Sequence, residues 1–125
     1  MTPLLFVAIA LAGGLGAVSR LTLDGLIRSR LSSTFPVGTF AINATGSLIL
    51  GFVTGLVMAS VLPEAWHLVI GTGFLGGYTT FSTASFETVR LVQEKRWGAA
   101  VFNGFGVLVI CVAAAGFGLW LGGLV

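Results

Sequence analysis

Long apolar runs alternate along the chain with short polar stretches. No charged residue occurs at positions 1–19, 31–63 or 97–125, and none occurs between Leu68 and Phe86. Each run is long enough for the about 20 apolar residues that a helix needs to cross a bilayer. The pattern therefore predicts an all-α integral membrane protein, with one domain that covers residues 1–125. Its four predicted spans lie at about residues 4–23, 38–62, 66–92 and 98–124.

The third apolar stretch differs from the others, because small and hydroxyl residues interrupt it. Residues 71–87 read GTGFLGGYTTFSTASFE, with four glycines and, between Thr79 and Ser85, five hydroxyl side chains. A broken backbone inside a membrane is tolerated only where protein or a polar cavity receives its free carbonyls and amides. We therefore expect the third span to be broken near Gly76-Gly77 and to mark the functional centre.

Polar side chains also recur along one face of the second span. Thr39, Asn43 and Ser47 are spaced four residues apart, so a helix places them on one side. An intramembrane Asn often only joins two helices. With a hydroxyl one turn to each side, the pattern instead favours a polar track, in which an uncharged amide can replace water around an anion. The last span has a weaker track, where Asn103 is the only strongly polar side chain.

Small residues are spaced along several spans so that neighbouring backbones can approach closely. On the first two spans they are Gly13, Gly14, Gly16, Ala17, Gly46, Gly51 and Gly55. Four helices are too few to enclose a continuous polar path and also to satisfy a broken helix. We therefore expect an oligomer, and a symmetric dimer is its simplest form.

Arg20 lies at the end of the first predicted span. Its side chain either extends to the membrane interface or faces a vestibule and attracts anions. Residues 24–37 form a polar connection that ends in Pro36, which disfavours helix at Phe35 and favours a helix start just after it.

Composition excludes a soluble domain. Charged residues make up 8% of the chain and hydrophobic residues 56%, whereas soluble domains have about 25% charged residues. The single cysteine, Cys111, excludes an intramolecular disulfide, and the single histidine, His67, has no neighbouring nucleophile. A glycine pattern at 71–76 matches a dinucleotide-binding motif, but the strands that such a site needs are missing. We expect neither enzyme activity nor a nucleic-acid partner.

The basic residues are distributed unequally between the two predicted sides of the membrane. With four spans, the connections 24–37 and 93–97 lie on one side, and both termini with the turn at 63–66 lie on the other. All six Lys and Arg residues fall on the first side: Arg20, Arg28, Arg30, Arg90, Lys95 and Arg96. The positive-inside rule then makes the basic connections cytoplasmic. Because a dual-topology homodimer needs near-equal charge on both sides, we hypothesise pairing with an oppositely oriented paralogue.

Three motifs together characterise the chain. They are Gly13-Gly14-x-Gly16-Ala17-x-x-Arg20, Gly38-Thr39-x-x-x-Asn43-x-x-Gly46, and Gly76-Gly77-Tyr78-Thr79-Thr80-Phe81-Ser82-Thr83 followed by Ser85 and Glu87. Over essentially its whole length the chain resembles the Fluc or CrcB family of fluoride channels, which are four-helix membrane proteins that work as antiparallel dimers.

The resemblance implies a passive channel in the cell membrane that exports cytoplasmic fluoride and relieves its toxicity. It also implies a structural sodium ion at the dimer centre, bound by the main-chain carbonyls of Gly76 and Thr79 from both subunits. Phe81 matches an aromatic whose positive ring edge faces the anion, and Arg20 matches the family's arginine near the vestibule. The expected ion path comprises Arg20, Thr39, Asn43, Ser47, Thr80, Phe81, Ser82, Thr83 and Asn103.

The chain also departs from the family pattern. Ala84 stands where the family has a second phenylalanine, and Val107 and Cys111 stand where it often has polar groups. These departures leave open an alternative, a poorly conducting partner subunit of a heterodimeric fluoride channel. A small proton-coupled exporter is the other alternative; such proteins need an acid embedded in their first span, and none is present here.

Overall fold

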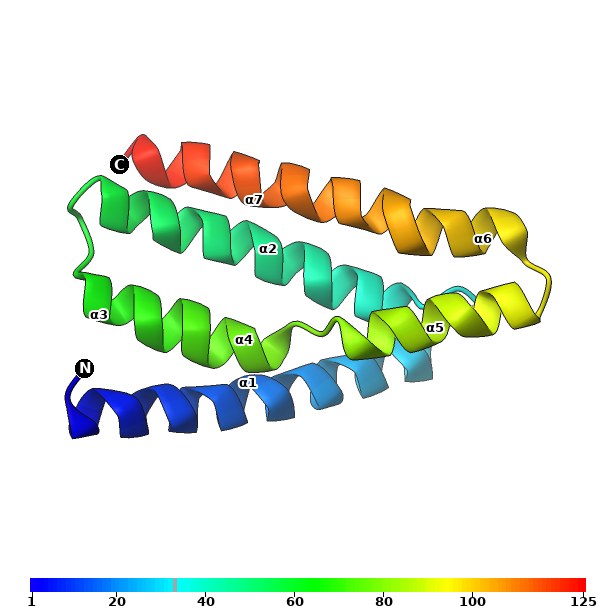
Figure 1. Ribbon diagram of the computed structural model, residues 1–125, viewed down its shortest axis with the longest axis horizontal. Coiled ribbons are helices and arrows are strands. Elements are labelled where there is room, and N and C mark those ends of the chain that lie inside the picture. Colours follow the sequence, from blue (N-terminus) through cyan, green and yellow to red (C-terminus); the bar gives the residue numbers. More distant parts are fainter. Residues whose placement is uncertain (33) are drawn as a thin grey trace.

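The computed structural model describes residues 1–32 and 34–125, and helices make up most of that part of the chain (Figure 1). The first two rods are α1 (Pro3–Arg30) and α2 (Val37–Met58). The third rod consists of α3 (Glu64–Trp66), the π-helical segment η1 (His67–Leu75), α4 (Gly76–Tyr78) and α5 (Ser82–Gln93). The fourth consists of α6 (Trp97–Val101), the π-helical segment η2 (Phe102–Gly106) and α7 (Val107–Gly123). The all-α class is as predicted.

The rods run side by side along one axis. Three helical stretches in the described chain are long and apolar enough to cross a membrane: Pro3–Arg30, Val37–Met58 and Trp97–Gly123. The remaining rod, from α3 to α5, runs beside them and is interrupted after Tyr78 (Figure 1). Both termini and the α2–α3 turn lie at one end, and the α5–α6 turn lies at the other (Figure 1). The limits of the spans within a membrane stay predictions.

Helix α1 extends further than the sequence pattern indicated. The prediction of a polar connection at 24–37 is wrong for its first part, because α1 continues to Arg30. Asp24 and Arg28 form an ion pair one turn apart, with Nε to Oδ2 at 3.0 Å, and basic residues in the last turn favour a helix C-terminus. Ser33, within the same predicted connection, lies outside the described residues.

Helix α2 ends earlier than the span predicted at 38–62. Its last residue is Met58, because Ser60 adopts a positive φ of 60°. The amide of Val61 then donates to the carbonyl of Leu56 at 3.0 Å, which is the hydrogen bond of a Schellman C-cap. A serine therefore occupies the left-handed position that helix ends usually give to glycine.

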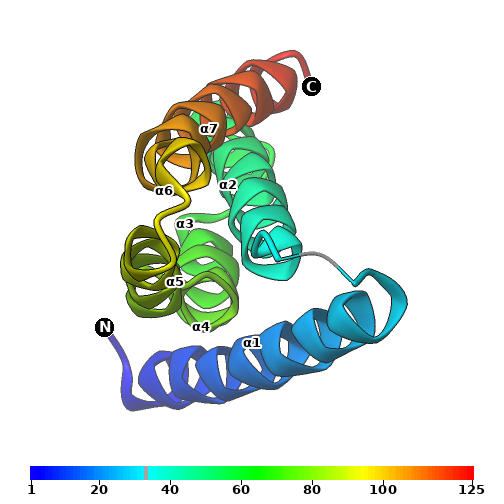
Figure 2. The same cartoon turned by 90° about the vertical axis from the view of Figure 1, so that its right-hand side faces the viewer.

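Glycines on α1 allow its backbone to contact the third rod directly. A methyl group on Gly16 would collide with the carbonyl of Phe74, and one on Gly77 would collide with the carbonyl of Gly13. The predicted close packing is confirmed for Gly16, whereas Gly14 has open space around it. Figure 2 shows α1 lying across the rod that contains α4.

A second glycine seam joins α2 to α7. Gly51 lies against the carbonyl of Ala115, and Gly118 lies against the carbonyl of Leu48, so neither position has room for a side chain. Figure 2 shows α2 and α7 side by side, with α1 at the opposite edge of the molecule from α7. The buried core between α2 and the third rod consists of Ile42, Leu75 and Tyr78, with Leu23, Ile70 and Phe74 packed against it.

Replacing Ser60 with glycine should stabilise the protein by about 1 kcal/mol, because a side chain in the left-handed region costs that much and glycine avoids the cost. The melting temperature of the detergent-solubilised protein, followed by circular dichroism, should rise by a few degrees. The control is Ser60→Ala, which keeps the Cβ atom and should give no increase. Equal melting of the glycine and alanine variants would contradict this account of the turn.

Candidate functional site

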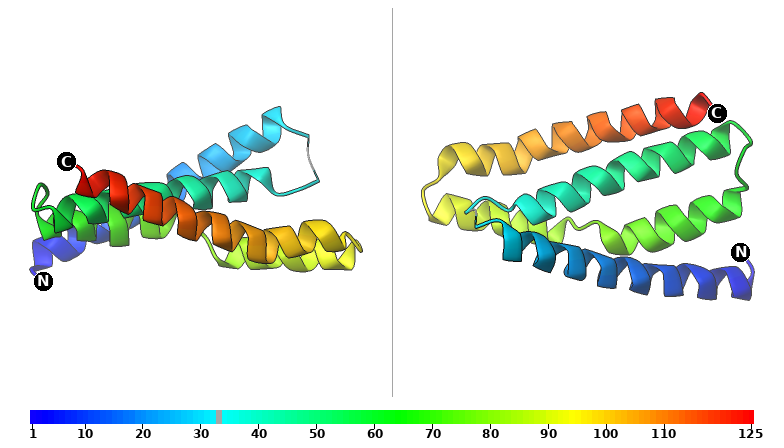
Figure 3. Two further views of the ribbon diagram at one scale, coloured as in Figure 1. Left: turned by 90° about the horizontal axis from the view of Figure 1, so that it is seen from above. Right: turned by 180° about the vertical axis from the view of Figure 1, so that it is seen from behind.

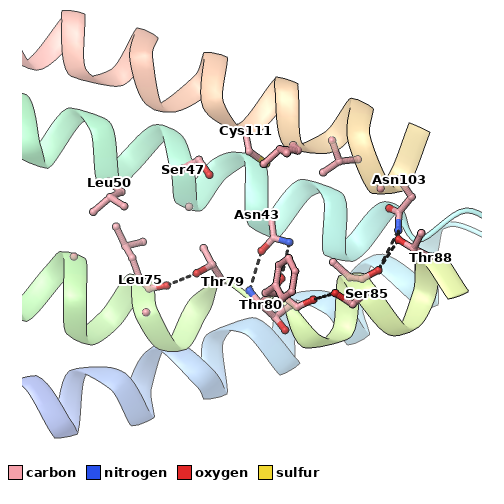
Figure 4. Close-up of a pocket in the computed structure, with 18 residues that line it drawn as sticks. Asn43, Ser47, Leu50, Leu75, Thr79, Thr80, Ser85, Thr88, Asn103 and Cys111 are labelled. Carbon is pink, nitrogen blue, oxygen red and sulfur yellow. Dashed lines mark hydrogen bonds between the residues drawn. The ribbon is translucent and has the colours of Figure 1, made fainter. Parts of the chain in front are cut away.

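A groove of about 570 Å³ lies between α2, the interrupted third rod and the start of the fourth rod (Figure 4). Among the residues that the structure describes, no charged side chain lines it. Its polar side chains are amides and hydroxyls: Asn43, Ser47, Thr79, Thr80, Ser85, Thr88 and Asn103. The groove can therefore offer hydrogen-bond donors without a fixed charge.

The interruption of the third rod lies at the middle of this groove. Helix α4 ends at Tyr78, Thr79 is extended with a ψ of 160°, and α5 begins at Ser82. Gly76 and Gly77, near which the sequence predicted a break, are themselves helical. Gly77 serves close packing against α1 instead, and the backbone leaves the helix after the next residue, Tyr78.

Asn43 pairs with the backbone inside the interruption. Its Nδ2 donates to the carbonyl oxygen of Thr80 at 2.9 Å, and the amide of Thr80 donates to its Oδ1 at 2.9 Å (Figure 4). One side-chain amide thus replaces both hydrogen bonds that this residue would make in a continuous helix. We call this pair of bonds the Asn43 clamp.

The residues around the interruption supply further hydrogen bonds. The amide and the hydroxyl of Thr79 both donate to the carbonyl of Leu75 at 2.9 Å. The hydroxyl of Thr80 accepts from the amide of Thr83 at 3.2 Å and thereby caps the start of α5. These bonds satisfy some of the polar groups at the two helix ends.

Arg20 reaches the same place from α1. Its Nε donates to the carbonyl of Gly77 at 3.3 Å. The positive charge of the guanidinium stabilises the negative, C-terminal end of α4. The sequence left open whether Arg20 extends to the interface or faces a vestibule. In the structure it is half-buried, bonded to the interrupted rod, and outside the residues that line the groove.

Two carbonyl oxygens at the interruption lose their usual helical partners. In a continuous helix the amide of Thr80 would bond to the oxygen of Gly76, but it donates to Asn43. Likewise, the amide of Thr83 would bond to the oxygen of Thr79, but it donates to the hydroxyl of Thr80. Uncommitted carbonyl oxygens are the ligands that a hard cation prefers. Gly76 and Thr79 therefore fit the predicted main-chain sodium ligands.

The other predicted path residues divide into two groups. Asn43, Ser47, Thr80, Phe81 and Asn103 line the groove, and Phe81 is 87% exposed there. Thr39, Ser82 and Thr83 do not line it: Thr39 is buried and Ser82 is exposed elsewhere.

Asn103 connects α5 to the fourth rod. Its Nδ2 donates to the hydroxyl of Thr88 at 2.7 Å and to the carbonyl of Ala84 at 3.3 Å (Figure 4). Sequence reasoning missed Thr88 and Ser85 as groove residues. Their helical spacing from Phe81 was the available signal, because positions 81, 85 and 88 share one face of a helix.

The departures from the family pattern also lie in the groove. Ala84, Val107 and Cys111 all line it, so part of the groove near the middle is apolar. Phe86 is exposed but does not line the groove, so it does not replace the missing aromatic.

The fold and the groove define a small multi-pass membrane protein with an uncharged polar site at a broken helix. A family model described as "CrcB-like protein, Camphor Resistance (CrcB)" matches residues 7–119. The chain belongs to this family, which confirms the resemblance seen in the sequence. It is a family of ion channels, so the prediction that the chain is not an enzyme is confirmed as well.

Curated relatives match over nearly the whole chain. The "Fluoride-specific ion channel FluC 1" of Leifsonia xyli subsp. xyli is 58% identical over 124 residues, which cover 99% of this chain and 90% of that protein. The "Fluoride-specific ion channel FluC 2" of Mycobacterium tuberculosis is 40% identical, with 97% of this chain and 93% of that protein covered. The "Fluoride-specific ion channel FluC" of Acidobacterium capsulatum is 43% identical, with 91% and 92% covered.

Replacing Asn43 with alanine should destabilise the protein strongly, because it leaves the amide and the carbonyl of Thr80 unpaired at about 1–3 kcal/mol each. The melting temperature in detergent should fall well below that of the parent. Ser47→Ala is the matched control, since Ser47 lies one turn away on the same groove face and makes no hydrogen bond with the residues that the structure describes. Similar melting of the two variants would contradict the Asn43 clamp.

Proposed function

We propose that this chain forms a passive fluoride-selective channel that lets cytoplasmic fluoride leave across the cell membrane. Relatives that match nearly its whole length are named as fluoride-specific ion channels. The observation that carries the proposal is the groove, which offers hydroxyl and amide donors and, in the described chain, no charged side chain. A conducting site must replace the water of the ion without holding it too tightly.

The hydrogen bonds within the protein narrow down which donors remain for an anion. The hydroxyls of Thr79, Ser85 and Thr88 donate to carbonyls one turn before them, so their hydrogens are committed. Asn103 has its amide hydrogens directed at Ala84 and Thr88.

Donors that remain free for an anion lie on the second span, α2. Asn43 has a second amide hydrogen beyond the one given to Thr80. Ser47 makes no hydrogen bond within the described residues, so its hydroxyl is a free donor. We therefore place the centre of the path at Asn43, Ser47 and the edge of the Phe81 ring, which carries partial positive charge.

The channel would be a dimer with antiparallel subunits. The groove is open on one side, and the ring of Phe81 is 87% exposed at its rim, which suits a surface that a second subunit covers. Carbonyl oxygens of Gly76 and Thr79 from both subunits would then hold a structural sodium ion. Such an ion supplies positive charge next to the negative C-terminal ends of the two α4 helices.

Passive conduction suits fluoride detoxification. Hydrogen fluoride crosses membranes as a neutral molecule and releases fluoride inside the cell, so the anion accumulates there. A channel lets the anion leave down its electrochemical gradient and needs no coupling. A proton-coupled exporter would need an embedded acid, and in the described chain no acidic side chain lines the groove.

A second candidate is a partner subunit within a heterodimeric channel. Two observations favour it: Ala84 and Val107 make part of the groove apolar, and all the basic residues except Arg20 lie in the last turns of α1 and α5 or in the α5–α6 connection. The positive-inside rule then favours a single orientation, and an oppositely oriented paralogue would complete the dimer.

Replacing Phe81 with isoleucine should reduce fluoride efflux from proteoliposomes by at least about tenfold, since the ring edge that faces the anion is lost. A fluoride electrode measures the efflux after a potassium ionophore is added. Phe86→Ile is the matched control, because Phe86 is exposed outside the groove, and it should conduct normally. Unchanged efflux in the Phe81 variant would remove this ring from the path. Efflux that requires a proton gradient would instead support the exporter, and absence of efflux from the parent would support the partner subunit.

If the chain has one orientation, a cysteine at Ser32 should be labelled from the cytoplasmic side only. Ser32 is exposed just beyond α1, and Cys111→Ser removes the native thiol. The measurement is membrane-impermeant maleimide labelling of intact and opened cells at native expression level. Comparable labelling from both sides would mean dual topology and would reject the heterodimer.

A further inference from the structure

Helix α5 is attached to the rest of the third rod only through the non-helical residues after Tyr78. Its rotation about its own axis is therefore not set by α4. One face of α5, with Ala84, Ser85 and Thr88, lines the groove. Contacts on the other sides of α5 must hold that orientation.

A side of α5 next to the groove face carries a buried carboxylate. Glu87 is only 3% exposed and Leu91, one turn later, is fully buried. Charged side chains are almost never buried this far without a partner. The partner of Glu87 comes from α1: Nη2 of Arg28 lies 3.3 Å from its Oε2.

Arg28 forms ion pairs with two acidic side chains at once. Its Nε contacts Oδ2 of Asp24 at 3.0 Å, while its Nη2 contacts Glu87. The second oxygens of both carboxylates are buried and have no hydrogen-bond partner among the described residues. Loss of Arg28 would thus leave the buried carboxylate of Glu87 without its ion pair.

The position of the pair explains why a long side chain is needed. In the view from above, α5 and α6 diverge from α1 toward this end of the molecule (Figure 3, left). The arginine side chain spans that separation and links the last turn of α1 to the middle of α5. On the groove side, Asn103 holds α5 through the carbonyl of Ala84.

We propose that Arg28 and Glu87 form an ionic anchor that fixes the rotation of α5 and so turns Phe81 and Ser85 toward the groove. Glu87 is then a positioning residue, which acts through α5 and does not touch the ion. Without the anchor, the unpaired carboxylate moves toward water, and α5 turns with it because side chains on a helix move as one body. The consequence for conduction rests on the proposed function, whereas the rotation itself does not.

Thiol labelling tests the rotation directly. The parent for all variants carries Cys111→Ser and Ser85→Cys, so the only thiol is on the groove face of α5. We expect a small water-soluble methanethiosulfonate to label this parent, and Arg28→Ala to slow labelling by about tenfold as the thiol leaves the groove. Arg90→Ala is the matched control: Arg90 lines a small pocket with Glu87, no bond between them is found in the described chain, and labelling should stay at the parent rate.

A charge exchange distinguishes an anchor from a general loss of stability. Arg28→Glu and Glu87→Arg, combined with Asp24→Asn to remove the repulsion that Asp24 would otherwise exert on a carboxylate at position 28, restore the pair with its polarity reversed and should bring the labelling rate back to within about threefold of the parent. Equal rates in the Arg28→Ala variant and the parent, no recovery in the exchanged variant, or no labelling of the parent would each overturn the anchor.

Fluoride efflux provides the second readout. Without the Ser85→Cys reporter, Arg28→Ala should lower efflux by about tenfold and the exchanged variant should recover it. If the wild-type chain conducts no fluoride but the labelling results hold, the proposed function fails and the anchor stands. If wild-type efflux is normal and Arg28→Ala leaves both labelling and efflux unchanged, only the anchor fails.

Discussion

A helix that breaks inside a membrane exposes amides and carbonyls that no water can satisfy, and this constraint organises the structure. The Asn43 clamp meets it with two hydrogen bonds of 2.9 Å to Thr80. Because the amide of Thr80 is directed to Asn43, the carbonyl oxygen of Gly76 is left uncommitted in the middle of the groove. The bond from Thr80 to Asn43 thus stabilises the interruption and leaves a carbonyl oxygen that can bind a cation.

Much of the fold was predictable from the sequence, because apolar runs, small residues and helical spacing are local patterns. The polar face of Asn43 and Ser47 and the close packing of the glycines on α1 and α2 are examples. The partner of Asn43 was not predictable, since it lies far along the chain and depends on how the rods pack. The pair Gly76-Gly77 indicated a nearby break, yet Gly77 itself meets the backbone of α1 and stays helical. The extension of α1 was missed because its charged residues suggested a connection.

The charged side chains of the described ion pairs lie outside the groove, whose own polar side chains are uncharged. The described ion pairs gather where α1 ends, around Arg28, and Arg20 bonds to the end of α4 rather than standing in the groove. Cations therefore act on helix ends and helix orientation, while the proposed path keeps neutral donors. This separation matches what fluoride conduction requires, because a fixed cation in the path would hold the anion.

The central claim is that the Asn43 clamp releases the carbonyl oxygen of Gly76, which the proposed sodium ion uses. It is tested most directly by the melting temperature of the detergent-solubilised protein in sodium chloride and in N-methyl-D-glucamine chloride at equal ionic strength. The account predicts that the parent melts higher in sodium, that Ser47→Ala keeps this difference, and that Asn43→Ala loses it. A parent that melts equally in both salts, or an Asn43→Ala variant that keeps the full difference, would contradict it.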